Sequence, residues 1–201
     1  MEKAVLKTLI YSDIFDYPLK AWEIHKWLIG EKCDMIQVEK ALKRLILKKQ
    51  VIYKNDLFAL SGRESLLSKR KATLNPQNLK RLQLITTSLK VIPWIKMVGI
   101  YGDWSMKKIG RRDPVKLLVV TSGNKLGISK TLIEGVLAGV EKIFLNQVIY
   151  EEELEFRIKN LFTAHEVLQM QLIWQREGIY TTYLNDNSWV FKFLPNWTTS
   201  H

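Results

Sequence analysis

The spacing of apolar residues changes near Pro93, and this change constrains the fold more than any other feature of the sequence. Before Pro93, apolar side chains recur every three or four residues, as in amphipathic helices. After Pro93 come short apolar runs rich in β-branched residues, such as 115–121, and a helical pattern at about 129–140 precedes the strand pattern of 142–150. The sequence therefore predicts an α+β protein whose helical N-terminal part is followed by a small α/β sheet.

Length and composition set further limits. A chain of 201 residues with 47% hydrophobic residues can form one large or two small domains. The single cysteine, Cys33, cannot form an internal disulfide, and the three histidines are too scattered for a metal site. No apolar stretch is long enough for a signal peptide or a membrane span, so we expect a cytoplasmic protein without a membrane partner. We expect three segments, at 1–61, 62–92 and 93–201.

The first segment shows the pattern of three helices followed by a β-hairpin. Asp16-Tyr17-Pro18 ends the first helix, and Gly30 follows the second. Asp34 and Gln37 form a capping-box pattern at the start of the third helix, and Asn55-Asp56 is a turn signal between two short strands. This order is typical of a winged helix-turn-helix domain, in which the third helix enters the major groove and the hairpin contacts the DNA backbone.

The positive charge is concentrated in one stretch of the chain. The formal net charge is +11, and residues 40–90 alone contain 13 Lys and Arg but only 2 acidic residues. Such a stretch favours nucleic acid as partner, because neutralised phosphates release counterions. The residues expected to contact duplex DNA are Lys40, Lys43, Arg44, Lys48 and Lys54. Two alternatives remain open, namely a solvated basic surface and a winged helix that binds only a protein partner.

Four further segments have expected structures. Residues 62–72 are predicted to form a basic amphipathic helix, and Asn75-Pro76 to open the helix that leads to Pro93. The acidic run 151–155 is predicted to start a helix. Thr163 and Glu166 have capping-box spacing. The helix that they open is expected to carry Val167, Met170, Leu172 and Trp174. The aromatic segment 180–197 is expected to pack across the sheet.

Residues 98–120 have the pattern strand, glycine turn, short helix, strand. Here the sequence resembles the nucleotidyltransferase fold of the DNA polymerase β-like superfamily. The whole chain is similar to bacterial proteins that join an N-terminal winged helix to such a domain. The resemblance rests on short pieces in a fixed order, at 11–18, 60–63, Arg70, 92–93, Gly102, 163–170, 187–189 and 193–196.

The resemblance implies Gly-Ser at the turn and, twelve and fourteen residues after that glycine, two aspartates that bind Mg²⁺ ions. In this chain Asp103 follows Gly102 in place of serine, and the two ligand positions fall on Pro114 and Lys116. Neither residue binds Mg²⁺, which needs oxygen ligands. A third carboxylate is expected on the strand at 142–150, which offers Asn146-Gln147 instead.

These departures favour a non-catalytic domain, a pseudoenzyme with no metal or other cofactor. In that case Gly102 and Lys116 are the candidates for holding a phosphate, or Lys116 forms an ion pair with Asp103 or Asp113. The alternative is an active, Mg²⁺-dependent nucleotidyltransferase in which Asp103 and Asp113 supply relocated carboxylates. A strand bulge would be needed, because a shift of one residue turns a side chain to the other face of the sheet.

Overall fold

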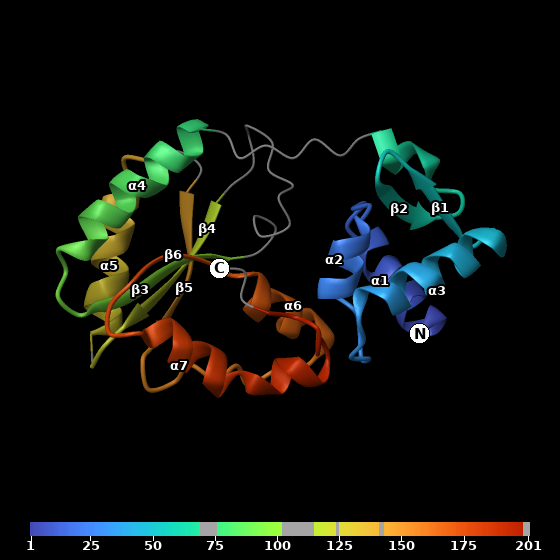
Figure 1. The fold of residues 1–201 in the computed structure, drawn as a ribbon. Coiled ribbons are helices and arrows are strands. Elements are labelled where there is room, and N and C mark those ends of the chain that lie inside the picture. The colour runs from blue at the N-terminus through green and yellow to red at the C-terminus, as the bar shows by residue number, and fades with distance from the viewer. Residues whose placement is uncertain (69–75, 102–114, 124, 141–142, 199–201) are drawn as a thin grey trace. The chain divides into compact units, whose positions relative to one another are not determined.

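The protein is described by a computed structural model, which covers residues 1–68, 76–101, 115–123, 125–140 and 143–198 (Figure 1). The architecture is mixed α+β, as the sequence predicts. The chain divides into two compact units, residues 1–71 with 189–201 and residues 72–188. None of the helices in the described ranges is long and apolar enough to cross a bilayer.

Three helices and a hairpin form the first unit, in the predicted order. They are α1 (Glu2–Asp13), α2 (Ala21–Lys26), α3 (Met35–Leu47), β1 (Val51–Lys54) and β2 (Leu57–Leu60). β1 and β2 are antiparallel, and Asn55 and Asp56 between them have φ angles of 52° and 63°. Positive φ at both positions is what a two-residue type I′ turn requires. Leu19 pairs with Phe58 through two backbone hydrogen bonds of 2.7 and 3.1 Å, and so extends the hairpin.

The start of α3 confirms the predicted capping box. The Asp34 side chain accepts from Gln37 N at 2.8 Å, and the Gln37 side chain accepts from Asp34 N at 3.1 Å. The inner face of α3 is buried through Val38, Ala41, Leu42 and Leu45. Each buried leucine contributes about 2 kcal/mol by leaving water, so the packing of this face fixes which side of the helix is exposed.

The described parts of residues 62–92 contain two helical elements. Glu64–Ser68 is a short 3₁₀ helix, η1, and its Leu67 packs on Leu57 and Ala59 of the hairpin. The rest of the helix predicted at 62–72 lies outside the described residues. α4 (Pro76–Lys90) has Pro76 as its first residue, as predicted, and belongs to the second unit.

Residues 189–198 pack with the first unit, although the sequence assigned them to the second domain. Residues 189–192 belong to a 3₁₀ helix, η3 (Ser188–Lys192), and residues 193–198 follow it. Gly30 N donates to Phe193 O at 2.7 Å. The Asn196 side chain accepts from Cys33 N and donates to His25 O, both at 3.0 Å. These bonds satisfy polar groups around the loop between α2 and α3, which gives the C-terminal segment its position.

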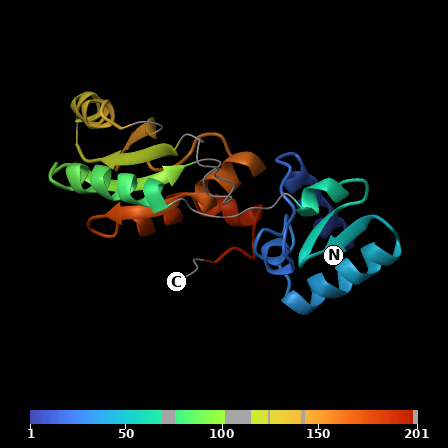
Figure 2. The ribbon, with the colours of Figure 1, turned by 90° about the horizontal axis from the view of Figure 1, so that it is seen from above.

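A four-stranded sheet forms the centre of the second unit. Its strands are β3 (Ile95–Tyr101), β4 (Val115–Thr121), β5 (Ile143–Tyr150) and β6 (Gln171–Gln175), in the order β5-β4-β3-β6. β4 and β5 are parallel and are joined through α5 (Leu126–Leu137), whereas the other neighbours are antiparallel. α4 and α5 cover one face of the sheet, with a core that includes Leu89, Val98, Leu117 and Ile133 (Figures 1 and 2).

The C-terminal half of the second unit differs from the sequence prediction. α6 (Leu161–Gln169) is capped by Asn160, whose side chain accepts from Thr163 N at 2.9 Å, so Thr163 is not the cap. Leu172 and Trp174 lie on β6 and not on a helix. Residues 151–155 form turns and irregular structure, and α7 (Ile179–Asp186) contacts β3 and β6.

Candidate functional site

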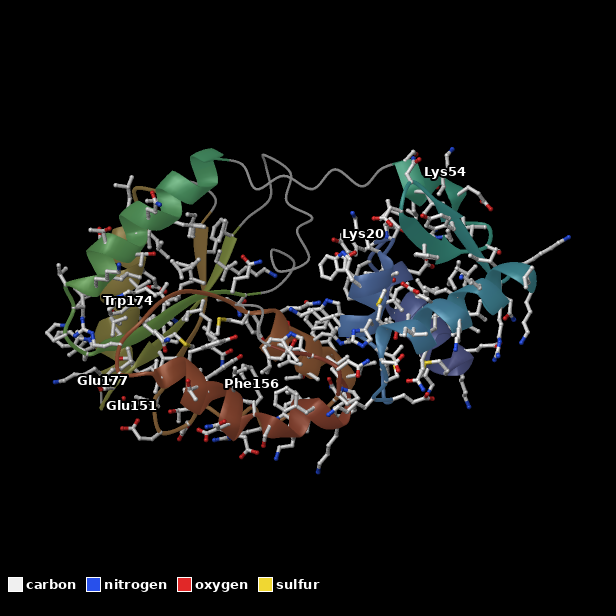
Figure 3. All side chains as sticks on the ribbon, in the orientation of Figure 1. Lys20, Lys54, Glu151, Phe156, Trp174 and Glu177 are labelled. Carbon is white, nitrogen blue, oxygen red and sulfur yellow. The ribbon has the colours of Figure 1, made fainter. Side chains whose placement is uncertain are left out.

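The basic residues of α3 lie on its solvent face. Lys40, Lys43, Arg44 and Lys48 are all exposed, opposite the buried positions that begin at Val38. Lys54 is exposed at the end of β1, directly before the hairpin turn (Figure 3). The structure therefore groups four of the five predicted DNA-contacting residues on one helix surface.

Two of these four residues already have an acidic partner. Glu2 on α1 accepts a hydrogen bond from Lys48 Nζ at 2.6 Å, and its other carboxylate oxygen lies 3.9 Å from Arg44. The hydrogen bond from Lys48 lowers the pKa of Glu2, so the carboxylate keeps its charge at neutral pH. Lys40 and Lys43 form no salt bridge with another residue of the described ranges. Glu2 is an acidic partner of this basic face that the sequence did not reveal, because the contact joins two different helices.

An open groove of about 1170 Å³ lies in the second unit. Val115 and Leu117 face the core beneath α4 and α5, so Lys116 between them points to the opposite face of the sheet. The groove lies on this opposite face and is completed by α6, α7 and the segment 151–160, which we call the wall segment. Its lining residues are Tyr101, Lys116, Leu126, 146–150, 152–158, Thr163, Glu166 and Asp186.

Tyr101 and Glu166 form a hydrogen-bonded pair in this groove. The Tyr101 hydroxyl donates to Glu166 Oε2 at 3.0 Å. Burial raises the pKa of Tyr101, and the neighbouring Glu166 carboxylate raises it further, so the phenol keeps its proton throughout the neutral range. The pair thus joins a neutral phenol of β3 to a carboxylate of α6.

Some of the metal-ligand positions expected from the resemblance lie in the groove, and the others lie outside the described residues. Lys116 is exposed in the groove, and Asn146-Gln147 of the adjacent strand line it as well. The sheet register shifts between Leu117 and Leu118, which places Gln147 opposite Leu118. Within the described ranges, no group of three or more His, Cys, Asp or Glu side chains could hold a metal ion. The other predicted positions, Gly102, Asp103, Asp113 and Pro114, lie outside the described residues.

The charge of the groove lining could not be foreseen from any local motif. Among the described residues, the lining contains five carboxylates and two cations, Lys116 and Arg157. The carboxylates are Glu152, Glu153, Glu155, Glu166 and Asp186. These carboxylates repel a ligand with several phosphates where it comes close to them, because like charges repel each other.

Comparison with known proteins gives only distant similarity. No family model and no curated protein matches the chain. Two solved structures are similar at 11% identity, and each comparison covers 56% of this chain. The first, a mutant toxin–antitoxin MntA-HpeT, has a TM-score of 0.32 with 85% of its own chain covered. The second, a toxin–antitoxin with AMP-PNP, has a TM-score of 0.34 with 86% covered. Both scores are below the level that defines a shared fold.

Proposed function

We propose that the first unit binds duplex DNA, mainly through phosphate contacts from the exposed face of α3 and from the hairpin. The observation that carries this proposal is the grouping of Lys40, Lys43, Arg44 and Lys48 on one solvent face of a helix anchored by its other face. The order of three helices and a hairpin supports a winged helix, in which this helix and Lys54 would both meet the duplex. Because the candidate contacts are lysines and an arginine and include no Asn or Gln for adenine recognition, we expect affinity without strong sequence preference.

The test is a titration of a random duplex at several salt concentrations. Replacing Lys40, Lys43 and Arg44 together with alanine should weaken binding to all sequences alike and lower the salt slope by about three. The matched control removes the same charge from the second unit, by alanine at the exposed residues Lys125, Lys130 and Lys159. An affinity that does not change with salt concentration, or that is unchanged by the α3 substitutions, would contradict the proposal and favour a surface for a protein partner.

We also propose that the second unit is a nucleotidyltransferase-like domain that binds an anionic ligand without catalysing transfer. Support comes from Lys116, which brings an ammonium group into the groove at a position where the resemblance implies a carboxylate. Asn146-Gln147 beside it are neutral. The carboxylates among the described lining residues favour a ligand with a single phosphate or carboxylate at Lys116 over a ligand with several phosphates.

Two measurements separate this proposal from an active enzyme. Calorimetric titration with inorganic phosphate should show binding that is lost in Lys116→Gln and retained in the control Lys130→Gln. Incubation with labelled nucleoside triphosphates, Mg²⁺ or Mn²⁺ and candidate acceptors should show no transfer. Transfer that disappears in Asp113→Asn would establish the alternative, an active nucleotidyltransferase with relocated carboxylates.

A further inference from the structure

Asn187 follows α7 directly and is completely buried, at 0% exposure. Its side-chain oxygen accepts from Phe156 N at 2.9 Å. Its side-chain nitrogen donates to Leu154 O at 2.8 Å and to Tyr183 O at 2.9 Å. One amide group thus ties two backbone positions of the wall segment to the end of α7.

The wall segment has little backbone bonding of its own where Asn187 holds it. Glu153 N donates to Tyr150 O at 3.2 Å before this stretch, and Ala164 N donates to Asn160 O at 2.9 Å after it. From Leu154 to Lys159, no backbone–backbone hydrogen bond joins the segment to another residue in the described ranges. A stretch without helix or strand bonding opens locally at low free energy unless side chains hold it. The side chain of Asn187 supplies this fixation in the structure.

The fixed stretch determines what covers the groove side of Tyr101. The ring of Phe156 lies parallel to the ring of Tyr101, with a centroid distance of 6.3 Å and an interplanar angle of 6°. Phe156 also contacts the ring of Tyr183 edge-on, at 6.3 Å. Tyr101 in turn donates to Glu166. The contacts therefore run without interruption from Asn187 through the Phe156 backbone and ring to the polar pair in the groove.

We propose that Asn187 is a positioning residue for the groove: it holds residues 154–156 so that the wall stands opposite Lys116 and Phe156 stays on Tyr101. This inference rests on the groove being the ligand site proposed above. It assigns the role to a single side chain. Asn187 pairs Phe156 N and Leu154 O, two main-chain groups of the wall segment, and a shorter apolar side chain at this position would leave them without these bonds.

Hydrogen exchange measured by NMR or mass spectrometry tests the inference without a ligand. In the unmodified protein, the Phe156 amide should exchange more slowly than the amides of Glu155 and Arg157. In Asn187→Ala, exchange across 152–158 should become at least about tenfold faster, which corresponds to one lost hydrogen bond of about 1.4 kcal/mol. The control Asn185→Ala, at an exposed position of α7, should leave this exchange unchanged.

Phosphate binding gives a second readout that a general loss of stability would not reproduce. Asn187→Ala should weaken the binding of inorganic phosphate while the amides of β3 and β4 keep their protection. Asn187→Asp keeps the acceptor for Phe156 N but loses both donated bonds, so it should protect Phe156 better than alanine does and still release Leu154. Unchanged exchange at 152–158, or an equal loss of protection in β3 and β4, would overturn the inference. If phosphate does not bind to the unmodified protein but the exchange results hold, the ligand proposal fails and the positioning role stands.

Discussion

Tyr101 and Lys116 are direct cross-strand partners on β3 and β4, so their side chains leave the same face of the sheet. Their environments nevertheless differ. Tyr101 is 6% exposed and donates to Glu166, whereas Lys116 is exposed. A buried neutral donor and an exposed ammonium group therefore stand side by side in the groove. In this arrangement the Tyr101 hydroxyl forms a hydrogen bond within the protein, whereas the Lys116 ammonium group is exposed to solvent.

The Tyr101 hydroxyl should contribute to stability through Glu166. Tyr101→Phe removes the 3.0 Å hydrogen bond and leaves the partly buried carboxylate without this donor. The free energy of unfolding should fall by about 1.5–3 kcal/mol, as for other hydrogen bonds to charged groups. Urea denaturation measures the change. Tyr180→Phe is the control, since the Tyr180 hydroxyl has no hydrogen-bond partner in the described ranges. Equal losses in the two variants would argue against a special role for the Tyr101–Glu166 bond.

Removing the charge of Glu2 should strengthen DNA binding. Glu2→Gln frees Lys48 and Arg44 from their acidic partner, so two more cations can meet phosphates. We expect affinity for a random duplex to rise by a few fold and the salt slope to increase by about two. Stability should hardly change, because exposed ion pairs contribute little. Glu134→Gln on α5 changes the net charge equally and should have a much smaller effect. Equal gains from both variants would indicate a general charge effect.

His165 should make the protein sensitive to acid. It is 4% exposed, and burial lowers its pKa to about 4 from 6.5. Between these pH values the unfolded chain binds more protons at His165 than the folded chain does. The contribution of neutral His165 to the free energy of unfolding is therefore fully present above pH 6.5 and is lost as the pH falls toward 4. The loss attributable to His165 is about 3 kcal/mol at the low end. Denaturation curves at pH 6.5 and 4.5 should show a smaller difference for His165→Gln than for the unmodified protein. The same pH dependence in both would exclude His165 as the cause.

Gly99 should be required by the close packing of Met170. A Cβ atom at position 99 would overlap the Met170 sulfur, and Met170 is buried at 3% exposure. Gly99→Ala should therefore lower the free energy of unfolding by about 1–3 kcal/mol. Combining it with Met170→Ala should give less loss than the sum of the two single changes. Gly135→Ala on α5, where no atom lies within 4 Å of the added methyl group, should stabilise the protein slightly. If Gly99→Ala leaves the free energy of unfolding unchanged, the Met170 side chain moves to make room for the added methyl group.

Much of the local structure could be predicted because its signals are local. The Asp34 and Gln37 side chains cap α3 through backbone groups only three residues away. Asn55-Asp56 sets the hairpin turn by accepting positive φ angles. The buried and exposed faces of α3 follow from the helical repeat alone. For the same reason, the strands 95–101 and 115–121 could be placed within a sheet before their register was known.

The sequence by itself determined the helices and hairpin of the first unit, the basic face of α3 and the absence of a carboxylate at Lys116. Only the tertiary structure decided which distant segments meet: Glu2 with Lys48, Tyr101 with Glu166, and Asn187 with the wall segment. It also made Leu172 and Trp174 part of a strand, because pairing with β3 satisfies their backbone groups. Caps, turns and periodicity depend on neighbours within a few residues, whereas these contacts depend on how whole elements pack, which no short stretch of sequence encodes.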